Sequence, residues 1–251
     1  MDFTRNLRKG VSGDDVVLAK ERLLSLGYYA ERITSVSRRT FGADTLDAVK
    51  RFQKQAGLSV DGVIGAETWV KLFGGETAAE KQQLPTPSDK ARSIVRLARE
   101  RIGDLYVWGG SGMTDISDAK IREKDGDTGA SRSIAFRDKQ YKYGFSDILG
   151  HDCSGFISYL LRECGIWNER RDCDALWARC GEVARNELIP GDLLFRVDSA
   201  NASNETHVGL YCGRGVVIHC KGRDVGVVAE GINHGGSGYW HKCGRMKILY
   251  T

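Results

Sequence analysis

The chain has 251 residues, of which 41% are hydrophobic and 28% charged, and its formal net charge is +4. These values are ordinary for a globular protein with one large domain or two smaller ones, and the mild basic excess suits an acidic polymer as partner. We expect no nucleic-acid partner, because no basic run with interleaved aromatic residues occurs, and no membrane insertion, because no stretch is long and apolar enough to cross a bilayer.

The seven cysteines are odd in number and form no CxxC pair. Structural zinc uses close ligand pairs, so we expect no metal site, and we expect no cofactor. An odd count indicates reduced, mostly buried thiols rather than a disulfide framework. The first ten residues contain no apolar segment of the kind that a secretory signal peptide needs, which predicts synthesis in a reducing cytoplasm.

Residues 1–74 are predicted to form a small domain of three amphipathic helices around one core. Apolar residues recur at helical spacing in three stretches, around residues 16–26, 44–52 and 66–72. Gly27 and Gly57 follow the first two stretches and can end them in the left-handed conformation that glycine adopts most easily.

Residues 75–90 are predicted to be a linker between two domains. The segment is polar and contains two of the three prolines of the chain, Pro85 and Pro87. Such a segment packs poorly, and it can tether a second domain close to a surface that the first domain binds.

The second predicted domain, residues 91–251, has a cysteine at the start of a helix. Cys153 opens a stretch with one apolar stripe that ends before Gly165. Unpaired backbone N–H groups and the positive end of the helix dipole favour the thiolate at such a position. A single cysteine on a helix is more often a small buried hydrophobe, so the residues around it decide its role.

Two histidines lie on a predicted β-hairpin of residues 207–212 and 216–220. With residues 213–215 as the loop, His207 and His219 share one face as diagonal neighbours, with Cβ atoms about 7–8 Å apart. A two-residue loop would send His219 to the opposite face. A helix-initial thiol, a base and a group that orients the base indicate hydrolysis or acyl transfer at a carbonyl.

Short motifs of the first domain resemble the peptidoglycan-binding 1 family, which implies bacterial peptidoglycan as the partner. These motifs are Leu7-Arg8-Lys9-Gly10, Leu26-Gly27-Tyr28-Tyr29, Ala48-Val49-Lys50-Arg51-Phe52-Gln53, Gly57-Leu58-Ser59-Val60-Asp61-Gly62 and Gly65-Ala66-Glu67-Thr68-Trp69. The stretch of residues 31–41 is longer than the turn that usually precedes the second helix of this family.

The second domain resembles the NlpC/P60 cysteine peptidases. The motifs that carry this resemblance are Tyr106-Val107-Trp108-Gly109-Gly110, Asp152-Cys153-Ser154-Gly155-Phe156, Pro190-Gly191-Asp192-Leu193-Leu194-Phe195, His207-Val208-Gly209-Leu210-Tyr211 and Ile218-His219. The resemblance implies a papain-like α+β domain with helices packed on an antiparallel sheet. It also implies cleavage of peptidoglycan stem peptides, typically between the γ-carboxyl of D-glutamate and a diamino acid.

Carried over by position, the resemblance implies that Cys153 is the nucleophile, His207 the general base and His219 the group that orients His207. It assigns four further residues to substrate binding: Tyr106, Trp108, Asp152 and Ser154. For Asp152, a role as helix cap is at least as well supported. The backbone N–H of Cys153 is the natural oxyanion donor.

The interval of residues 111–151 is much longer than the few residues usual for this family. It is polar, and it is expected beside the cleft as a lid or substrate wall, or as a surface excursion without substrate contact. Two functional alternatives stay open: an amidase or other acyl transfer on the same scaffold, and a non-catalytic wall-binding module. We expect a monomer that acts at the bacterial cell wall, as an endolysin released by phage-type lysis would.

Overall fold

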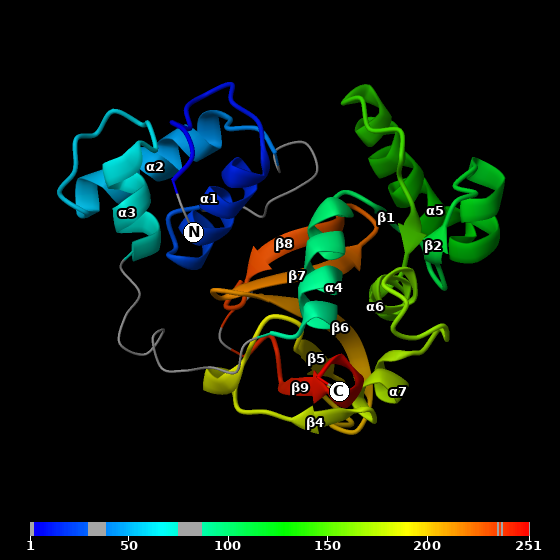
Figure 1. Cartoon of the computed structure of the whole chain (residues 1–251). Helices are drawn as coiled ribbons and strands as arrows, with labels where there is room; N and C mark the ends of the chain where they lie inside the picture. Colours follow the sequence, from blue (N-terminus) through cyan, green and yellow to red (C-terminus); the bar gives the residue numbers. More distant parts are fainter. Residues whose placement is uncertain (1–2, 30–38, 75–86, 235, 237, 251) are drawn as a thin grey trace. The chain divides into compact units, whose positions relative to one another are not determined.

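The computed structural model describes residues 3–29, 39–74, 87–234, 236 and 238–250 (Figure 1). The chain divides into two compact units, Met1–Leu84 and Pro85–Thr251. Most of the predicted linker, residues 75–86, lies outside the described residues, as do residues 31–38 of the long connection noted above. The three-part boundaries 1–74, 75–90 and 91–251 stay a prediction.

The first unit contains the three helices expected from the apolar spacing. They are α1 (Asp14–Ser25), α2 (Ala43–Gln55) and α3 (Ala66–Gly74). Each contributes fully or almost fully buried apolar side chains to one core, including Leu23, Phe52 and Leu72. Gly27 and Gly57 follow the first two helices with φ of 78° and 68°, as predicted for glycine after a helix end.

The second unit has an α+β fold, as predicted, with a six-stranded antiparallel sheet in the order β4-β9-β5-β6-β7-β8. The strands are β4 (Cys180–Glu182), β5 (Leu193–Val197), β6 (Glu205–Gly213), β7 (Val216–Gly222), β8 (Gly226–Gly231) and β9 (Lys242–Met246). The helices that pack on its central strand β6 are α4 (Asp89–Glu100), α6 (Cys153–Glu163) and α7 (Cys173–Trp177) (Figure 1). Two short 3-10 helices, Arg185–Glu187 and Lys247–Leu249, complete the unit.

A second, small sheet leads the chain into α6. Its strands are β1 (Leu105–Tyr106), β2 (Ser111–Met113) and β3 (Gly150–His151), with β3 between the other two. Since His151 immediately precedes the α6 cap, this sheet fixes where that helix begins.

The long insert folds into α5 (Asp118–Lys142), which packs against β1 at the edge of the unit (Figure 1). The helix is broken at Gly126, whose φ of 65° and ψ of 169° are not helical. Ile121, Ala130 and Phe136 join a hydrophobic cluster with Leu105 and Val107. The insert is therefore a packed part of this unit. Among the described helices, none is long and apolar enough to cross a membrane.

The hairpin of β6 and β7 corrects one detail of the sequence analysis. The loop is the two residues Arg214 and Gly215, with φ of 53° and 73°, rather than the predicted three. A bulge between Tyr211 and Gly213 adds one residue on the first strand, and the pairing of Leu210 with Ile218 follows. The bulge offsets the shorter loop, so both hairpin histidines share a face despite a two-residue turn.

Candidate active site

A cavity of about 820 Å³ opens at the start of α6 and gathers most of the predicted site residues. Of these, Tyr106, Trp108, Asp152, Cys153, Ser154 and His207 line it. His219 does not: it lies behind His207 and its side chain is 1% exposed. The further lining side chains used below are Arg170, Cys173, Lys221 and Arg223.

Asp152 fixes the start of the helix that carries the cysteine. Its Oδ1 accepts a hydrogen bond from the Gly155 N–H at 2.6 Å, which is an N-cap contact. Its Oδ2 accepts the Gly109 N–H at 2.9 Å and pairs with Arg170. Asp152 is thus a helix cap that also lines the cavity, and its carboxylate already has several donors.

Cys153 is the first residue of α6, and its surroundings favour the thiolate. The Sγ of Cys173 lies 3.9 Å from its Sγ. A hydrogen bond from Cys173, outweighing burial, and the hydrogen bond and charge of His207 lower the pKa of Cys153 to about 4. The neighbouring Cys153 raises the pKa of Cys173, which therefore stays protonated and can donate its S–H.

His207, His219 and Glu230 form a chain of hydrogen bonds away from the cavity. Nε2 of His207 lies 2.7 Å from Nδ1 of His219, and Nε2 of His219 lies 3.2 Å from Oε2 of Glu230. Burial lowers the pKa of His219 to about 4, so this ring is neutral at neutral pH. Burial would raise the pKa of Glu230, but the bonds from His219 and Lys221 lower it to about 2.

The carboxylate at the end of this chain decides which nitrogens carry protons. The ionised carboxylate of Glu230 only accepts, so His219 places its hydrogen on Nε2 and leaves Nδ1 as an acceptor. His207 then donates from Nε2, so Nδ1 is the atom that can take the proton of the Cys153 thiol. This assignment makes Nδ1 of His207 the basic atom available to Cys153.

Two family models match the chain in the places where these features lie. Residues 12–72 match a peptidoglycan binding domain, and residues 138–245 match the NlpC/P60 family. The C-terminal unit belongs to the NlpC/P60 family. His207, His219 and the helix-initial Cys153 all fall inside the matched range.

The chain has relatives among curated proteins and solved structures. A Listeria seeligeri protein named probable endopeptidase p60 is 29% identical over 147 residues, which are 59% of this chain and 20% of that relative. The N-acetylmuramoyl-L-alanine amidase CwlL of Bacillus licheniformis is 30% identical over 179 residues, covering 62% of this chain and 46% of CwlL. The peptidoglycan hydrolase RipB of Mycobacterium tuberculosis is 21% identical, with 80% of each chain covered and a TM-score of 0.45. The match with this chain thus spans less than half the length of the Listeria protein and of CwlL.

Trp240 contacts both His207 and His219 and was not among the predicted residues. Its ring stacks on His207 at a centroid distance of 5.7 Å and an angle of 17°, and meets His219 edge-on at 5.3 Å. Gly209 makes room for it, because a Cβ there would lie 2.9 Å from Trp240 and 3.2 Å from the His219 Cβ. The tryptophan restricts the rotation of the proposed base.

The insert supports the cleft from behind rather than lining it. No residue between Gly110 and His151 is among the described residues around the cavity. Instead, Asp125 of α5 accepts the backbone N–H of Trp108 at 2.9 Å, and Ser133 donates its hydroxyl to the Tyr106 carbonyl at 2.8 Å. Among the described residues the insert forms neither of the expected structures, a lid or substrate wall or a mere surface excursion, and instead braces the two aromatic residues that line the cleft.

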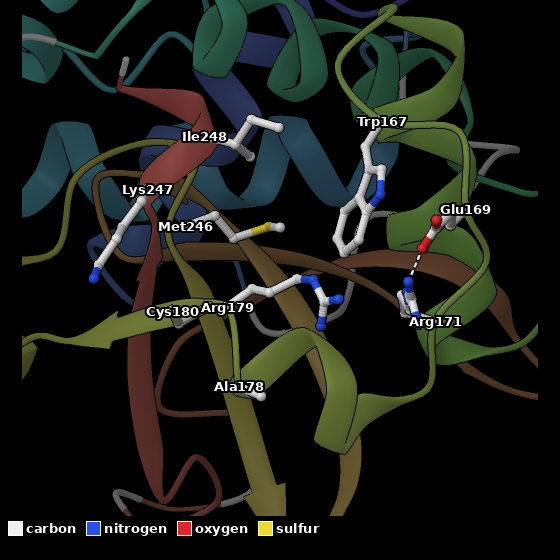
Figure 2. Close-up of a pocket in the computed structure, with 9 residues that line it drawn as sticks. All are labelled: Trp167, Glu169, Arg171, Ala178, Arg179, Cys180, Met246, Lys247 and Ile248. Carbon is white, nitrogen blue, oxygen red and sulfur yellow. Dashed lines mark ion pairs between the residues drawn. The ribbon is translucent and has the colours of Figure 1, made fainter.

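A second cavity of the NlpC/P60 unit, of about 490 Å³, lacks this chemistry (Figure 2). Figure 2 shows Trp167, Arg179 and Met246 around it, with the Glu169–Arg171 ion pair at one side. Cys180 also lines it, but burial raises the pKa of that thiol to about 12. No histidine lies among the described lining residues, so a thiolate with a base is found at the Cys153 cavity and not here.

Proposed function

We propose that this protein is a peptidoglycan hydrolase whose NlpC/P60 unit is a cysteine endopeptidase acting on stem peptides. The observation that carries the proposal is that Cys153, with its lowered pKa, and His207 line one cavity, and that the buried His219 and Glu230 continue the hydrogen-bond chain behind His207. The matched peptidoglycan binding domain supports the same polymer as substrate.

In the proposed mechanism the Cys153 thiolate attacks the carbonyl carbon of the scissile amide. Nδ1 of His207 takes up the thiol proton as the thiolate forms and delivers it to the leaving amine. The developing oxyanion faces the backbone N–H of Cys153, which lies in the first turn of α6 and has no acceptor within its own helix. The acyl-enzyme is then hydrolysed by a water that His207 deprotonates.

The finer assignment is the bond between the γ-carboxyl of D-glutamate and a diamino acid, which rests on the resemblance of the motifs. Tyr106, Trp108, Asp152 and Ser154 are proposed to contact substrate. The first unit is proposed to bind peptidoglycan and keep the catalytic unit at the bacterial cell wall, where tethering raises its effective concentration.

A second candidate is cleavage between sugar and peptide by an N-acetylmuramoyl-L-alanine amidase. The similarity to CwlL, which carries that name, favours it. Both reactions hydrolyse an amide, so the proposed Cys153 chemistry could serve either one, and the bond that is cut separates them.

The test is mass spectrometry of fragments released from purified peptidoglycan by the wild type and by Cys153→Ala. New peptides that begin with a free diamino acid, absent with the variant, are expected. Free lactyl ends on the sugar would instead establish the amidase. Equal absence of fragments with both proteins, with wall binding retained, would leave only a binding module.

A further inference from the structure

The side chain of Arg223 lines the wall of the cleft. Its guanidinium lies 5.1 Å from the centre of the Tyr106 ring, and its side chain is 27% exposed. Nη2 donates to Oδ1 of Asp125 at 3.0 Å. Its Nε is buried without an acceptor among the described residues, and the Arg223 side chain lines the cavity.

Lys221 and Arg170 also line the cavity, and each forms an ion pair with an acidic residue of the site. Lys221 donates to both oxygens of Glu230, at 2.7 and 3.0 Å. Arg170 pairs with the α6 cap, Asp152. Arg223 is therefore the cleft cation whose pairing serves neither the histidine chain nor the start of the catalytic helix.

The insert is shaped to hold this arginine. Asp125 has a fully buried side chain and accepts hydrogen bonds from Arg223 and from the Trp108 N–H. Gly129, which follows the break at Gly126, leaves room for the side chain, because a Cβ there would lie 2.8 Å from Nε of Arg223. Residues of the insert thus fix the position of a cleft residue that comes almost a hundred positions later in the chain.

We propose that Arg223 binds a free carboxylate of the substrate next to the scissile bond, and that the insert positions it for this. The inference rests on the proposed function. A D-glutamyl residue linked through its γ-carboxyl keeps its α-carboxylate free, and guanidinium binds such a group with charge-assisted hydrogen bonds. The enzyme then selects stem peptides with the free acid over those in which this carboxylate is an amide.

The experiment measures kcat/KM on two synthetic peptides, L-Ala-γ-D-Glu-diamino acid and the same peptide with the glutamate α-carboxylate amidated. The wild type is expected to prefer the free acid by about 10- to 100-fold, the range of one charge-assisted contact. Arg223→Gln should lose far more kcat/KM on the acid than on the amide, so that the preference falls toward one, and circular dichroism checks that the variant is folded. Gly129→Ala should lose part of the preference by displacing the guanidinium without changing any charge.

Arg132→Gln is the matched control, because it removes an exposed arginine of the insert that pairs with Asp224 outside the cavity. The preference of this variant for the free-acid peptide should equal that of the wild type. Equal wild-type rates on the two peptides, or an equal loss on both with Arg223→Gln, would overturn the role of Arg223 while leaving the endopeptidase in place. Absence of Cys153-dependent cleavage of either peptide would overturn the proposed function, and the inference with it.

Discussion

Nε2 of His219 lies 3.2 Å from Oε2 of Glu230, and both side chains are almost completely buried. Because this contact sets the proton positions of both histidines, we predict that Glu230→Gln lowers kcat/KM on peptidoglycan fragments by about 10- to 100-fold. An amide can donate as well as accept, so it no longer dictates the tautomer of His219. The pH profile of kcat/KM should change together with its magnitude.

Lys221→Met separates this effect from the loss of the neighbouring ion pair. Lys221 donates to the same carboxylate, but its removal leaves the His219–Glu230 contact in place. We expect a smaller loss than with Glu230→Gln. Equal losses in the two variants, or an unchanged Glu230→Gln enzyme, would refute the tautomer role.

The reactivity of Cys153 should persist at acid pH. A thiol whose pKa is lowered remains a thiolate as the pH falls, and for Cys153 the thiolate is lost only as the pH falls through about 4. An ordinary thiol with pKa of about 8.5 loses roughly tenfold in thiolate for each unit below that value. Labelling by iodoacetamide between pH 5.5 and 8, followed by peptide mass spectrometry, should therefore be nearly constant at Cys153. A tenfold fall per pH unit would contradict the assignment, and Cys180, whose pKa is raised to about 12, should remain unlabelled.

Cys173→Ala should move the labelling profile of Cys153 to higher pH. The hydrogen bond from Cys173 is the largest cause of the lowered pKa, whereas His207 remains in the variant. Cys164→Ala, which removes a thiol at the other end of α6, is the control and should leave the profile in place. An unshifted profile in Cys173→Ala would show that His207 alone sustains the thiolate.

The main elements of the cleft could be predicted from the sequence because they depend on local patterns. The polar–cysteine–small run before an apolar stripe predicts a helix that begins at Cys153, and alternation around His207 and His219 predicts a hairpin. The loop length was wrong because a bulge near Gly213 leaves no mark in the apolar alternation.

The partners that complete the site come from distant segments and needed the structure. Glu230 reaches His219 because β8 pairs with β7, and Trp240 reaches His207 from the segment just before β9. The sequence did hold a sign of Glu230, because it is a charged residue at the end of the apolar run of β8. No sequence pattern pointed to Arg223, because its proposed role depends on how the insert packs.

Gly209→Ala should displace the proposed base, His207, indirectly through Trp240. The added Cβ would lie 2.6 Å from a Val217 methyl and 2.9 Å from Trp240, both buried, so the tryptophan that stacks on His207 must shift. We predict a loss of about 1–3 kcal/mol in the free energy of unfolding, as for other overpacked cores, together with a lower kcat. Gly181→Ala is the control, since nothing lies within 4 Å of its added Cβ. Urea unfolding and steady-state kinetics of both variants check this, and equal behaviour of the two would exclude the packing role.

Asp104 anchors the segment that leads into the catalytic helix. Its buried carboxylate accepts hydrogen bonds from Arg101 at 2.7 and 2.8 Å, from Nε2 of His151 at 2.9 Å and from the Leu149 N–H at 3.1 Å. Asp104→Asn removes the charge and leaves Arg101 buried with only the exposed carboxylate of Asp147, so we predict a loss of about 3–5 kcal/mol in the free energy of unfolding.

Asp147→Asn is the matched control for Asp104→Asn, because it removes a carboxylate from the same arginine. The Asp147 side chain is 86% exposed, and exposed ion pairs contribute at most about 1 kcal/mol. In urea unfolding of the full chain, the loss in the free energy of unfolding should therefore be several-fold larger for Asp104→Asn than for Asp147→Asn. Since His151 immediately precedes Asp152 and Cys153, Asp104→Asn should also slow iodoacetamide labelling of Cys153 in the folded protein. Equal stability of the two variants would mean that the buried Arg101–Asp104–His151 cluster does not anchor the start of the catalytic helix.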